Sequence, residues 1–266
     1  MTSTLTSSVD TTVLITGASA GFGQACAKRF AAAGARLVLA ARRLERLEKL
    51  KVELPVPVHA IRLDVRDRRD VEEAVGDLPM EFSEVDVLIN NAGLALGLES
   101  ANRTDLDDWE NMVDTNIKGL MYCTRLLLPG MVERNRGHII NLGSVAGTYP
   151  YPGGNVYGAT KAFVRQFSLN LRADLLGTKI RVTDVEPGIA RTEFSVVRFK
   201  GDDKRAQDVY AGTEPITAED IGEIVFWIAT MPEHLNINRI EVMPVCQSFG
   251  PFSFDRKSNG LFSADK

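Results

Sequence analysis

Short apolar segments alternate along the chain with longer segments in which apolar residues recur at helical spacing. The short segments predict strands at Val13–Thr16, Arg36–Ala41, Val58–Arg62, Val85–Asn90, His138–Leu142, Ile180–Glu186 and Arg239–Met243. The longer segments predict helices at Gly23–Ala33, Leu44–Glu53, Asp67–Gly76, Leu106–Arg134, Val156–Leu176 and Ala218–Thr230. Such alternation is typical of βαβ units, and continuously apolar strands suit a sheet that is covered on both faces. We therefore predict a single-domain α/β fold, a Rossmann-type, doubly wound parallel sheet of about seven strands with helices on both faces.

The two ends of the chain differ from this pattern. Residues 1–10 are rich in Ser and Thr and lack the basic start and apolar core of a secretory signal, so we expect a flexible arm. Residues 11–247 are expected to form the catalytic domain. The tail, residues 248–266, contains Phe249, Phe252, Phe254 and Phe262. Docking of this tail on a neighbouring subunit and disorder of the tail both remain open.

Composition and charge exclude several classes of protein. The 266 residues are 44% hydrophobic and carry a net charge of −4, which provides no basic footprint for a nucleic acid. No apolar run reaches the length that spans a membrane, and the cytoplasm is the expected location. The three cysteines and three histidines are dispersed, so neither a disulfide framework nor a metal site is expected.

A glycine-rich segment joins the first predicted strand to the first predicted helix. Its spacing is G-x-x-x-G-x-G, a variant of the dinucleotide-binding fingerprint. Glycines allow a tight turn and a close approach of the backbone to a pyrophosphate, and the following helix offers free N–H groups to the phosphates. The interpretation as an ordinary turn is disfavoured by this placement. The predicted cofactor contacts are Gly17, Ser19, Ala20, Gly21, Phe22 and Gly23.

The end of the second strand indicates which dinucleotide binds. An NAD site usually has an acidic residue there, which accepts hydrogen bonds from the ribose hydroxyls, whereas this chain has Arg42 and Arg43. Two guanidinium groups attract a 2′-phosphate and bind it bidentately, so we predict NADP as the cofactor. The alternative is a solvated pair of cations at a helix start.

Further cofactor contacts are expected after the third and fourth strands. Asp64, followed by Val65, either caps the next helix or accepts a bond from the adenine amino group, and these alternatives are compatible. Asn91, Ala92 and Gly93 suit a wall against the adenosine side, although the motif is also typical of a turn.

Tyr157 and Lys161 are candidate catalytic residues because positions i and i+4 lie on one face of a helix. A nearby cation favours the phenolate, and lowering the tyrosine pKa by about three units requires roughly 4 kcal/mol. Alone, this spacing is common and fits a core tyrosine beside a surface lysine. Ser144 follows the fifth strand and is able to donate to a substrate oxygen, although a serine there also suits a cap. Asn116 is a poor residue for a helix interior, which often marks a functional position.

The segment after the sixth strand supplies the remaining candidates. Thr192 is expected to bond the nicotinamide carboxamide, and Arg191 is our first candidate for a substrate carboxylate, ahead of Arg198 and Lys200. Basic loop residues are more often simply solvated. The polar segment 189–213 is predicted to be a mobile lid. The cofactor contacts expected at its start are Pro187, Gly188 and Ile189.

From Thr12 to about Met243, these motifs together resemble the short-chain dehydrogenase/reductase family: TGASAGFG, NNAG, an Asn within a helix, a Ser before YGATK, and EPG with a following Thr. The resemblance implies a catalytic tetrad of Asn116, Ser144, Tyr157 and Lys161. In it, Tyr157 is the acid or base, Ser144 positions the carbonyl, Lys161 binds the nicotinamide ribose, and Asn116 holds a relay water.

The stretches DTNIKGL, LPGMVERNRGHIINLGS and GGNVYGATKAFVRQFSLNLR, together with RFKGDD, are similar to the NADP-dependent 3-hydroxy acid dehydrogenases, also called L-allo-threonine or serine dehydrogenases. This similarity implies oxidation of the 3-hydroxyl of serine, L-allo-threonine and related small acids, and reduction of malonic semialdehyde. The family also implies a dimer or a tetramer, and we expect a homotetramer. The rival hypotheses are a carbonyl reductase for neutral ketones or sugars and a non-catalytic NADP(H) sensor.

Overall fold

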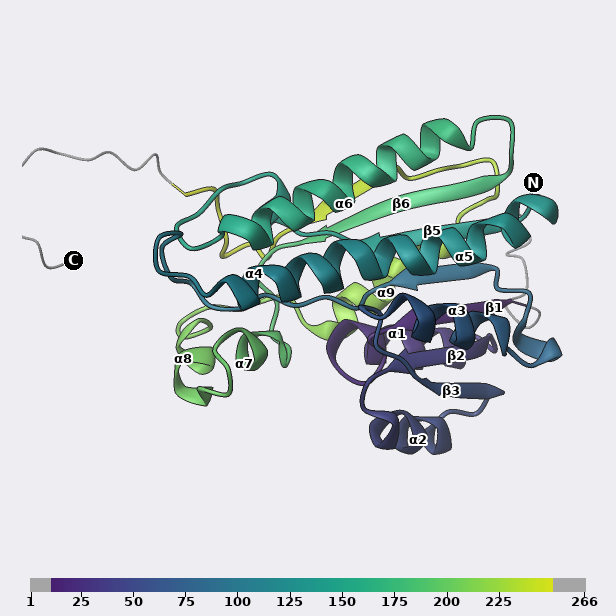
Figure 1. Cartoon of the computed structure of the whole chain (residues 1–266), viewed down its shortest axis with the longest axis horizontal. Helices are drawn as coiled ribbons and strands as arrows, with labels where there is room; N and C mark the ends of the chain where they lie inside the picture. The colour runs from purple at the N-terminus through teal and green to yellow at the C-terminus, as the bar shows by residue number, and fades with distance from the viewer. Residues whose placement is uncertain (1–10, 251–266) are drawn as a thin grey trace, which may run out of the picture.

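The computed structural model describes residues 11–250, in which seven parallel strands form one sheet. The sheet order is β3-β2-β1-β4-β5-β6-β7, so the winding reverses between β1 and β4. The strands are β1 (Thr12–Thr16), β2 (Arg36–Ala41), β3 (Val58–Arg62), β4 (Val87–Asn90), β5 (Gly137–Leu142), β6 (Ile180–Pro187) and β7 (Arg239–Val242). The predicted single-domain, doubly wound parallel sheet is confirmed (Figure 1).

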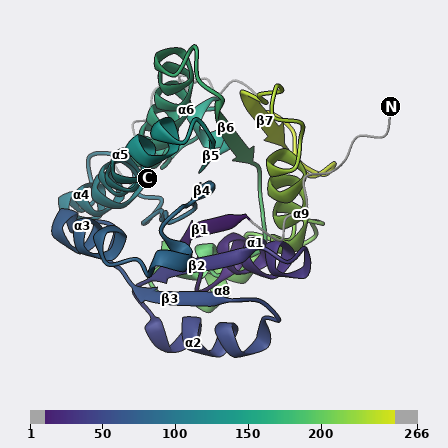
Figure 2. The same cartoon turned by 90° about the vertical axis from the view of Figure 1, so that its right-hand side faces the viewer.

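Helices cover both faces of the sheet (Figure 2). One apolar core lies under α1 (Gly21–Ala32), α2 (Leu44–Glu53) and α9 (Ala218–Ala229). The other core lies under α3 (Arg68–Gly76), α5 (Leu120–Glu133) and α6 (Asn155–Asp174). Successive residues of β1 enter opposite cores, Val13 and Ile15 the first and Leu14 the second. This alternation explains why the strands read as continuously apolar.

The predicted helix Leu106–Arg134 is interrupted. It consists of α4 (Leu106–Val113), a π-helical turn η3 (Asp114–Gly119) and α5. Gly119 packs closely against the loop that follows β3. A Cβ at this position would lie only 2.6 Å from Cγ2 of Val65. Insertions of this kind are frequent at functional sites, and this one contains Asn116.

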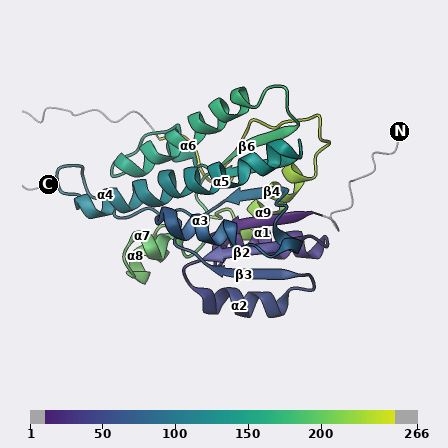
Figure 3. The ribbon, with the colours of Figure 1, turned by 45° about the vertical axis from the view of Figure 1, so that its right-hand side comes forward.

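The remaining short elements lie in connections. Two 3₁₀ turns, η2 (Met80–Phe82) and η4 (Val145–Gly147), precede β4 and follow β5. The predicted lid segment contains α7 (Phe194–Arg198) and α8 (Asp203–Asp208), which lie beyond the carboxyl ends of the strands (Figures 1 and 3). Tyr210 ties the end of this segment to its beginning through its hydroxyl, which donates to the carbonyl of Ala190 at 2.9 Å. None of the described helices is long and apolar enough to cross a membrane.

Candidate active site

A cavity of about 850 Å³ opens at the carboxyl edge of the sheet. This size is typical of a pocket that encloses a small-molecule ligand. The segments that follow all seven strands contribute to its lining, and a cavity is expected at the point where the winding reverses. The predicted site residues that line it are Gly17, Ser19, Ala20, Gly21, Phe22, Arg42, Arg43, Asp64, Val65, Asn91, Ala92, Gly93, Ser144, Tyr157, Lys161, Pro187, Gly188, Ile189 and Thr192. Gly23, Asn116 and Arg191 are not part of this lining.

The glycine-rich loop is shaped for a closely approaching ligand. Gly17 and Gly21 have φ angles of 66° and 53°, a region that favours glycine. Gly23 lies behind the loop, where a Cβ would be 2.5 Å from the Gly17 carbonyl oxygen. No side chain caps the start of α1 at Ala20, so its first N–H groups are available to a phosphate. The side chain of Asn91 holds this loop by donating to the carbonyls of Thr16 and Gly17 at 2.9 and 3.1 Å.

Arg43 is anchored beside the glycine-rich loop. Its Nε and Nη2 lie 3.3 and 3.1 Å from Oγ of Ser19. Its Nη1 lies 3.1 Å from Oε2 of Glu193, which also accepts from Arg46 at 3.0 Å. Arg42 is exposed and lines the same part of the cavity. Two guanidinium groups in the lining, those of Arg42 and Arg43, suit a phosphomonoester. Arg46, which shares Glu193 with Arg43, was not identified from the sequence.

Asp64 does not cap the next helix, because Asp67 accepts from the backbone N–H of Arg69 at 2.8 Å and performs that role. The Asp64 carboxylate instead receives both Nε and Nη2 of Arg66, the latter at 2.6 Å. The hydrogen bond from Arg66 lowers the pKa of Asp64. The carboxylate is therefore ionised and fixed at the edge of the cavity.

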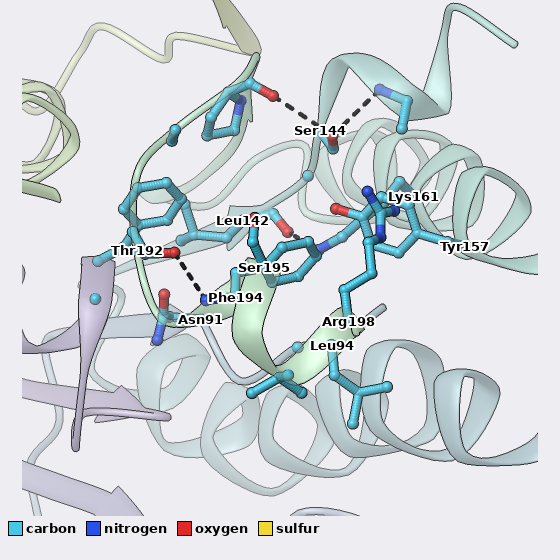
Figure 4. Close-up of a pocket in the computed structure, with 18 of the residues that line it drawn as sticks. Asn91, Leu94, Leu142, Ser144, Tyr157, Lys161, Thr192, Phe194, Ser195 and Arg198 are labelled. Carbon is cyan, nitrogen blue, oxygen red and sulfur yellow. Dashed lines mark hydrogen bonds between the residues drawn. The ribbon is translucent and has the colours of Figure 1, made fainter. Parts of the chain in front are cut away.

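Tyr157 and Lys161 come together on the first turns of α6, and Ser144 lies above them at the end of β5 (Figure 4). Nζ of Lys161 lies 5.9 Å from the centroid of the Tyr157 ring and donates to the Leu142 carbonyl at 2.6 Å. Oγ of Ser144 accepts from the N–H of Ala146 at 3.2 Å and lies 3.4 Å from the Pro187 carbonyl. The sequence-predicted convergence of these three side chains is present in the structure.

The environment shifts both titratable groups toward neutrality. Burial raises the pKa of Tyr157 to about 12, opposed by a hydrogen bond from Ser144 and by the positive charge of Arg198. Burial lowers the pKa of Lys161 to about 8, opposed by the charge of Asp184. At neutral pH, without a bound ligand, Tyr157 is therefore a phenol that is able to donate a proton.

Asn116 is buried next to this pair. Its amide exchanges hydrogen bonds with the backbone of Leu94 at 2.8 and 2.9 Å and donates to Oγ1 of Thr160 at 3.0 Å. Gly93 separates it from Lys161, because a Cβ there would lie 3.3 Å from the Asn116 amide oxygen and 3.5 Å from Nζ. The π turn therefore places a polar side chain against the loop that follows β4.

Arg198 of α7 is the lid cation that reaches the cavity (Figure 4). Its guanidinium carbon lies 5.1 Å from the Tyr157 ring centroid, and Nη2 donates to the hydroxyl of Tyr151 at 2.7 Å. Its Nε is buried and has no acceptor among the described residues. Arg191, our first candidate, is exposed and lies against Tyr210, 5.4 Å from that ring centroid.

The sequence did not identify several lining residues that come from distant segments. Gln247 accepts from the N–H of Ile189 at 2.7 Å. Phe249, in the predicted tail, packs at a tilt against Tyr149 with 4.6 Å between the ring centroids; residues 251–266 of that tail lie outside the described residues. Among residues 11–250, no group of three or more potential metal ligands occurs.

Comparisons with known proteins agree with this site. The family model for short chain dehydrogenase matches residues 11–203. The NADP-dependent 3-hydroxy acid dehydrogenase of Salmonella typhi is 60% identical over 245 residues, 92% of this chain and 99% of that protein. A sulfoacetaldehyde reductase of Chromohalobacter salexigens is 57% identical over 246 residues, 91% of this chain and 97% of that protein.

A solved structure described as the closed form of serine dehydrogenase complexed with NADP+ superposes with a TM-score of 0.91. It is 56% identical in sequence and covers 92% of this chain and 100% of its own. Since the family model alone spans well over half of its length, the chain belongs to the short chain dehydrogenase family.

Proposed function

We propose that this chain transfers a hydride between NADP(H) and the 3-hydroxyl of small 3-hydroxy acids such as serine, L-allo-threonine and 3-hydroxypropionate. In the reverse direction it reduces 3-oxo acids such as malonic semialdehyde. The observation that carries this proposal is the half-buried guanidinium of Arg198, which lacks an acceptor at Nε and whose carbon lies 5.1 Å from the centroid of the Tyr157 ring. A cation beside the candidate proton donor selects a substrate with an anionic group close to its reacting carbon.

The cofactor is NADP(H), and the cavity fits it. The uncapped start of α1 and the glycines of its loop suit the pyrophosphate, and Arg42 and Arg43 suit the 2′-phosphate. Thr192, which packs against Gly21 in the lining, is assigned the carboxamide of the nicotinamide. The relatives that are named for NADP dependence support this assignment.

NADP+ bound here supplies the hydride acceptor for alcohol oxidation. Tyr157 takes the hydroxyl proton as that oxygen becomes a carbonyl, and it returns the proton in the reverse reaction. Ser144 positions the substrate oxygen, since its hydroxyl lies beside that of Tyr157 (Figure 4). The hydrogen bond that this hydroxyl accepts from the backbone N–H of Ala146 fixes its orientation. Lys161 favours the phenolate and holds the nicotinamide ribose, and Asn116 orders a water in the proton path.

Arg198 is the proposed contact of the substrate acid group, replacing Arg191 in this role. One of its five N–H donors, on Nη2, is bonded to Tyr151, so donors remain for a carboxylate oxygen. One close relative is a sulfoacetaldehyde reductase, whose named substrate also carries an anionic group. A neutral ketone or sugar would leave the positive charge of Arg198 without an anionic partner, and an NADP(H) sensor would have no use for the Tyr157–Lys161 pair.

Tyr157→Phe tests the proposal. The variant should lose turnover by at least about 10²–10⁴-fold, because general acid–base catalysis contributes that much. It should retain NADPH binding, which is measured by fluorescence titration. Tyr122→Phe is a matched control, because Tyr122 is half-buried on α5 outside the cavity. Rates of NADP+ reduction are compared for serine, L-allo-threonine, 3-hydroxypropionate and neutral alcohols. Near-normal turnover of Tyr157→Phe, or a preference for neutral alcohols, would contradict the proposal.

A further inference from the structure

Two carboxylic acids are buried side by side behind the active site. Asp184 and Glu186 are each 1% exposed and lie two residues apart on β6. Because side chains alternate along a strand, both point to the same face, opposite to Val185, which enters the core under α1 and α9. Both acids therefore face the layer of α6, the helix that carries Tyr157 and Lys161.

These carboxyl oxygens lack the donors that would stabilise two negative charges. None of the four accepts a hydrogen bond from a described residue outside the pair, and Nε of Arg239 lies 3.5 Å from Oε2 of Glu186. Burial and a hydrogen bond to the Glu186 carboxyl raise the pKa of Asp184 well above its usual range. Two adjacent carboxylates in such a site cannot both ionise, so one proton is shared between them.

Charged and polar groups face the acid pair from each neighbouring element. Lys161 and Arg165, one turn apart on α6, act on it from above, and Lys161 interacts with Asp184 in particular. From β7, Arg239 also pairs with Glu241, which accepts from the hydroxyl of Tyr149 at 3.1 Å. On the β5 side, Asn141 is the sheet neighbour of Asp184, and its amide is bonded to Ser168 of α6.

Asp184 also packs against the segment after β5 that leads to Ser144. A Cβ on Gly143 would lie 2.3 Å from Oδ1 of Asp184, so its carboxyl fills the space beside this glycine. Gly143 lies between Leu142, whose carbonyl accepts from Lys161, and Ser144. Asp184 is therefore close to the segment that provides the hydrogen-bond acceptor of Lys161 and that carries Ser144.

We propose that Asp184 and Glu186 form a proton-sharing acid pair whose single negative charge acts as the buried counter-charge of Lys161 and keeps this lysine an ammonium during catalysis. The two acids are positioning residues, since neither lines the cavity. This inference rests on the proposed roles of Tyr157 and Lys161. It assigns to β6 a function in setting the pH range of the reaction.

The proposal predicts opposite effects for the two acids. In Asp184→Asn the negative charge moves to Glu186, which is farther from Lys161, so the Lys161 ammonium loses its proton more easily. In Glu186→Gln the negative charge is concentrated on Asp184, so the Lys161 ammonium loses its proton less easily. The alkaline limb of kcat/KM for NADPH-dependent reduction of malonic semialdehyde should therefore move to lower pH in the first variant and to higher pH in the second. Each shift should be about 0.5–1 pH unit.

Asp86→Asn is the control, because Asp86 is also buried but lies at the opposite edge of the sheet, where it accepts from the N–H of Thr12 at 2.9 Å. It should lower the melting temperature without moving the limb. The acid-pair proposal is overturned if the alkaline limb of the kcat/KM profile stays in place in both acid variants, or if it moves in the same direction in both. If Tyr157→Phe is inactive while these limbs stay in place, the proposed function stands and only this inference fails.

A measurement on the unaltered protein covers the case in which Asp184→Asn does not fold. Carboxyl ¹³C NMR of the full chain, labelled at Asp and Glu, should show a carboxyl that still holds its proton at neutral pH. This resonance should be absent from Glu186→Gln, where Asp184 no longer shares a proton. Titration of every Asp and Glu in the ordinary acidic range would overturn the proposal.

Discussion

Replacement of Arg198 by Met tests the origin of substrate selectivity. Methionine keeps an unbranched side chain of similar reach and retains packing against Phe194, whose ring centroid lies 5.5 Å from the guanidinium carbon. It removes the Nε donor and the charge that the proposed function assigns to the substrate acid group. Arg191→Met is the matched control, because this arginine lies in the same segment but is exposed and outside the cavity lining.

The expected loss is worked out for one charge-assisted hydrogen bond between Arg198 and the substrate. Nη2 is bonded to Tyr151 at 2.7 Å, and the buried Nε has no acceptor among the described residues. One charge-assisted hydrogen bond is worth about 1.5–3 kcal/mol. At about 1.4 kcal/mol for each tenfold change, kcat/KM for a hydroxy acid should fall about 10–150-fold. Ground-state binding contributes most of this loss, so KM should rise more than kcat falls.

Arg198 also lowers the pKa of Tyr157, so its loss affects every substrate. The informative quantity is therefore the ratio of kcat/KM for 3-hydroxypropionate to that for a neutral alcohol of the same chain length. This ratio should fall at least about tenfold in Arg198→Met and stay unchanged in Arg191→Met. An equal loss for both substrates would refute the assignment of Arg198 to the acid group, and a selective loss in Arg191→Met would restore Arg191.

Two further predictions concern the cofactor and the sheet. Replacing Arg42 and Arg43 by Ala should weaken NADPH binding about 10–150-fold and leave NADH binding nearly unchanged, because only the 2′-phosphate meets these cations. Fluorescence titration at fixed salt measures both affinities, and equal losses for the two cofactors would remove the basis for the NADP preference. His138 is buried, and burial holds its pKa well below 6.5. The unfolded chain therefore binds the extra proton as pH falls below about 6.5, and stability decreases there; His138→Gln should flatten the pH dependence of the urea unfolding free energy in that range, and an unchanged slope would contradict it.

Local sequence signals predicted the frame of the site because each acts within a few residues. The turn after β1 needs glycine at Gly17 and Gly21 for their positive φ angles, and this requirement is visible in the sequence. Lys161 follows Tyr157 by one helical turn, so their proximity needs no tertiary information. The parallel sheet then brings the ends of its strands to one edge, which placed Ser144 near this pair.

Contacts between distant segments could not be predicted in the same way. The sequence of the lid contains Arg191, Arg198 and Lys200 with no periodicity that separates them, and only the fold shows which one reaches the cavity. Nζ of Lys200 lies 2.8 Å from Oδ2 of Asp108 on α4, which is far from Lys200 in the sequence. In the sequence, the break at Asp114–Gly119 was visible only as residues that are unfavourable in a helix. The close packing of Val65 against Gly119 in this π turn is a contact between distant segments.

The polar ends of β4, β5 and β6 show how the fold exchanges stability for chemistry. Asn90 and Asn141 are hydrogen-bonded to each other at 2.9 Å in the interior, which compensates their burial except at Oδ1 of Asn90. Asp184 and Glu186, one strand away, are buried without such donors and must be destabilising relative to apolar residues of the same size. Valines at both positions should therefore raise the melting temperature. If the acids serve only packing, this gain would come without a change in pH dependence; if they hold the charge of Lys161, the more stable protein would lose activity at alkaline pH first.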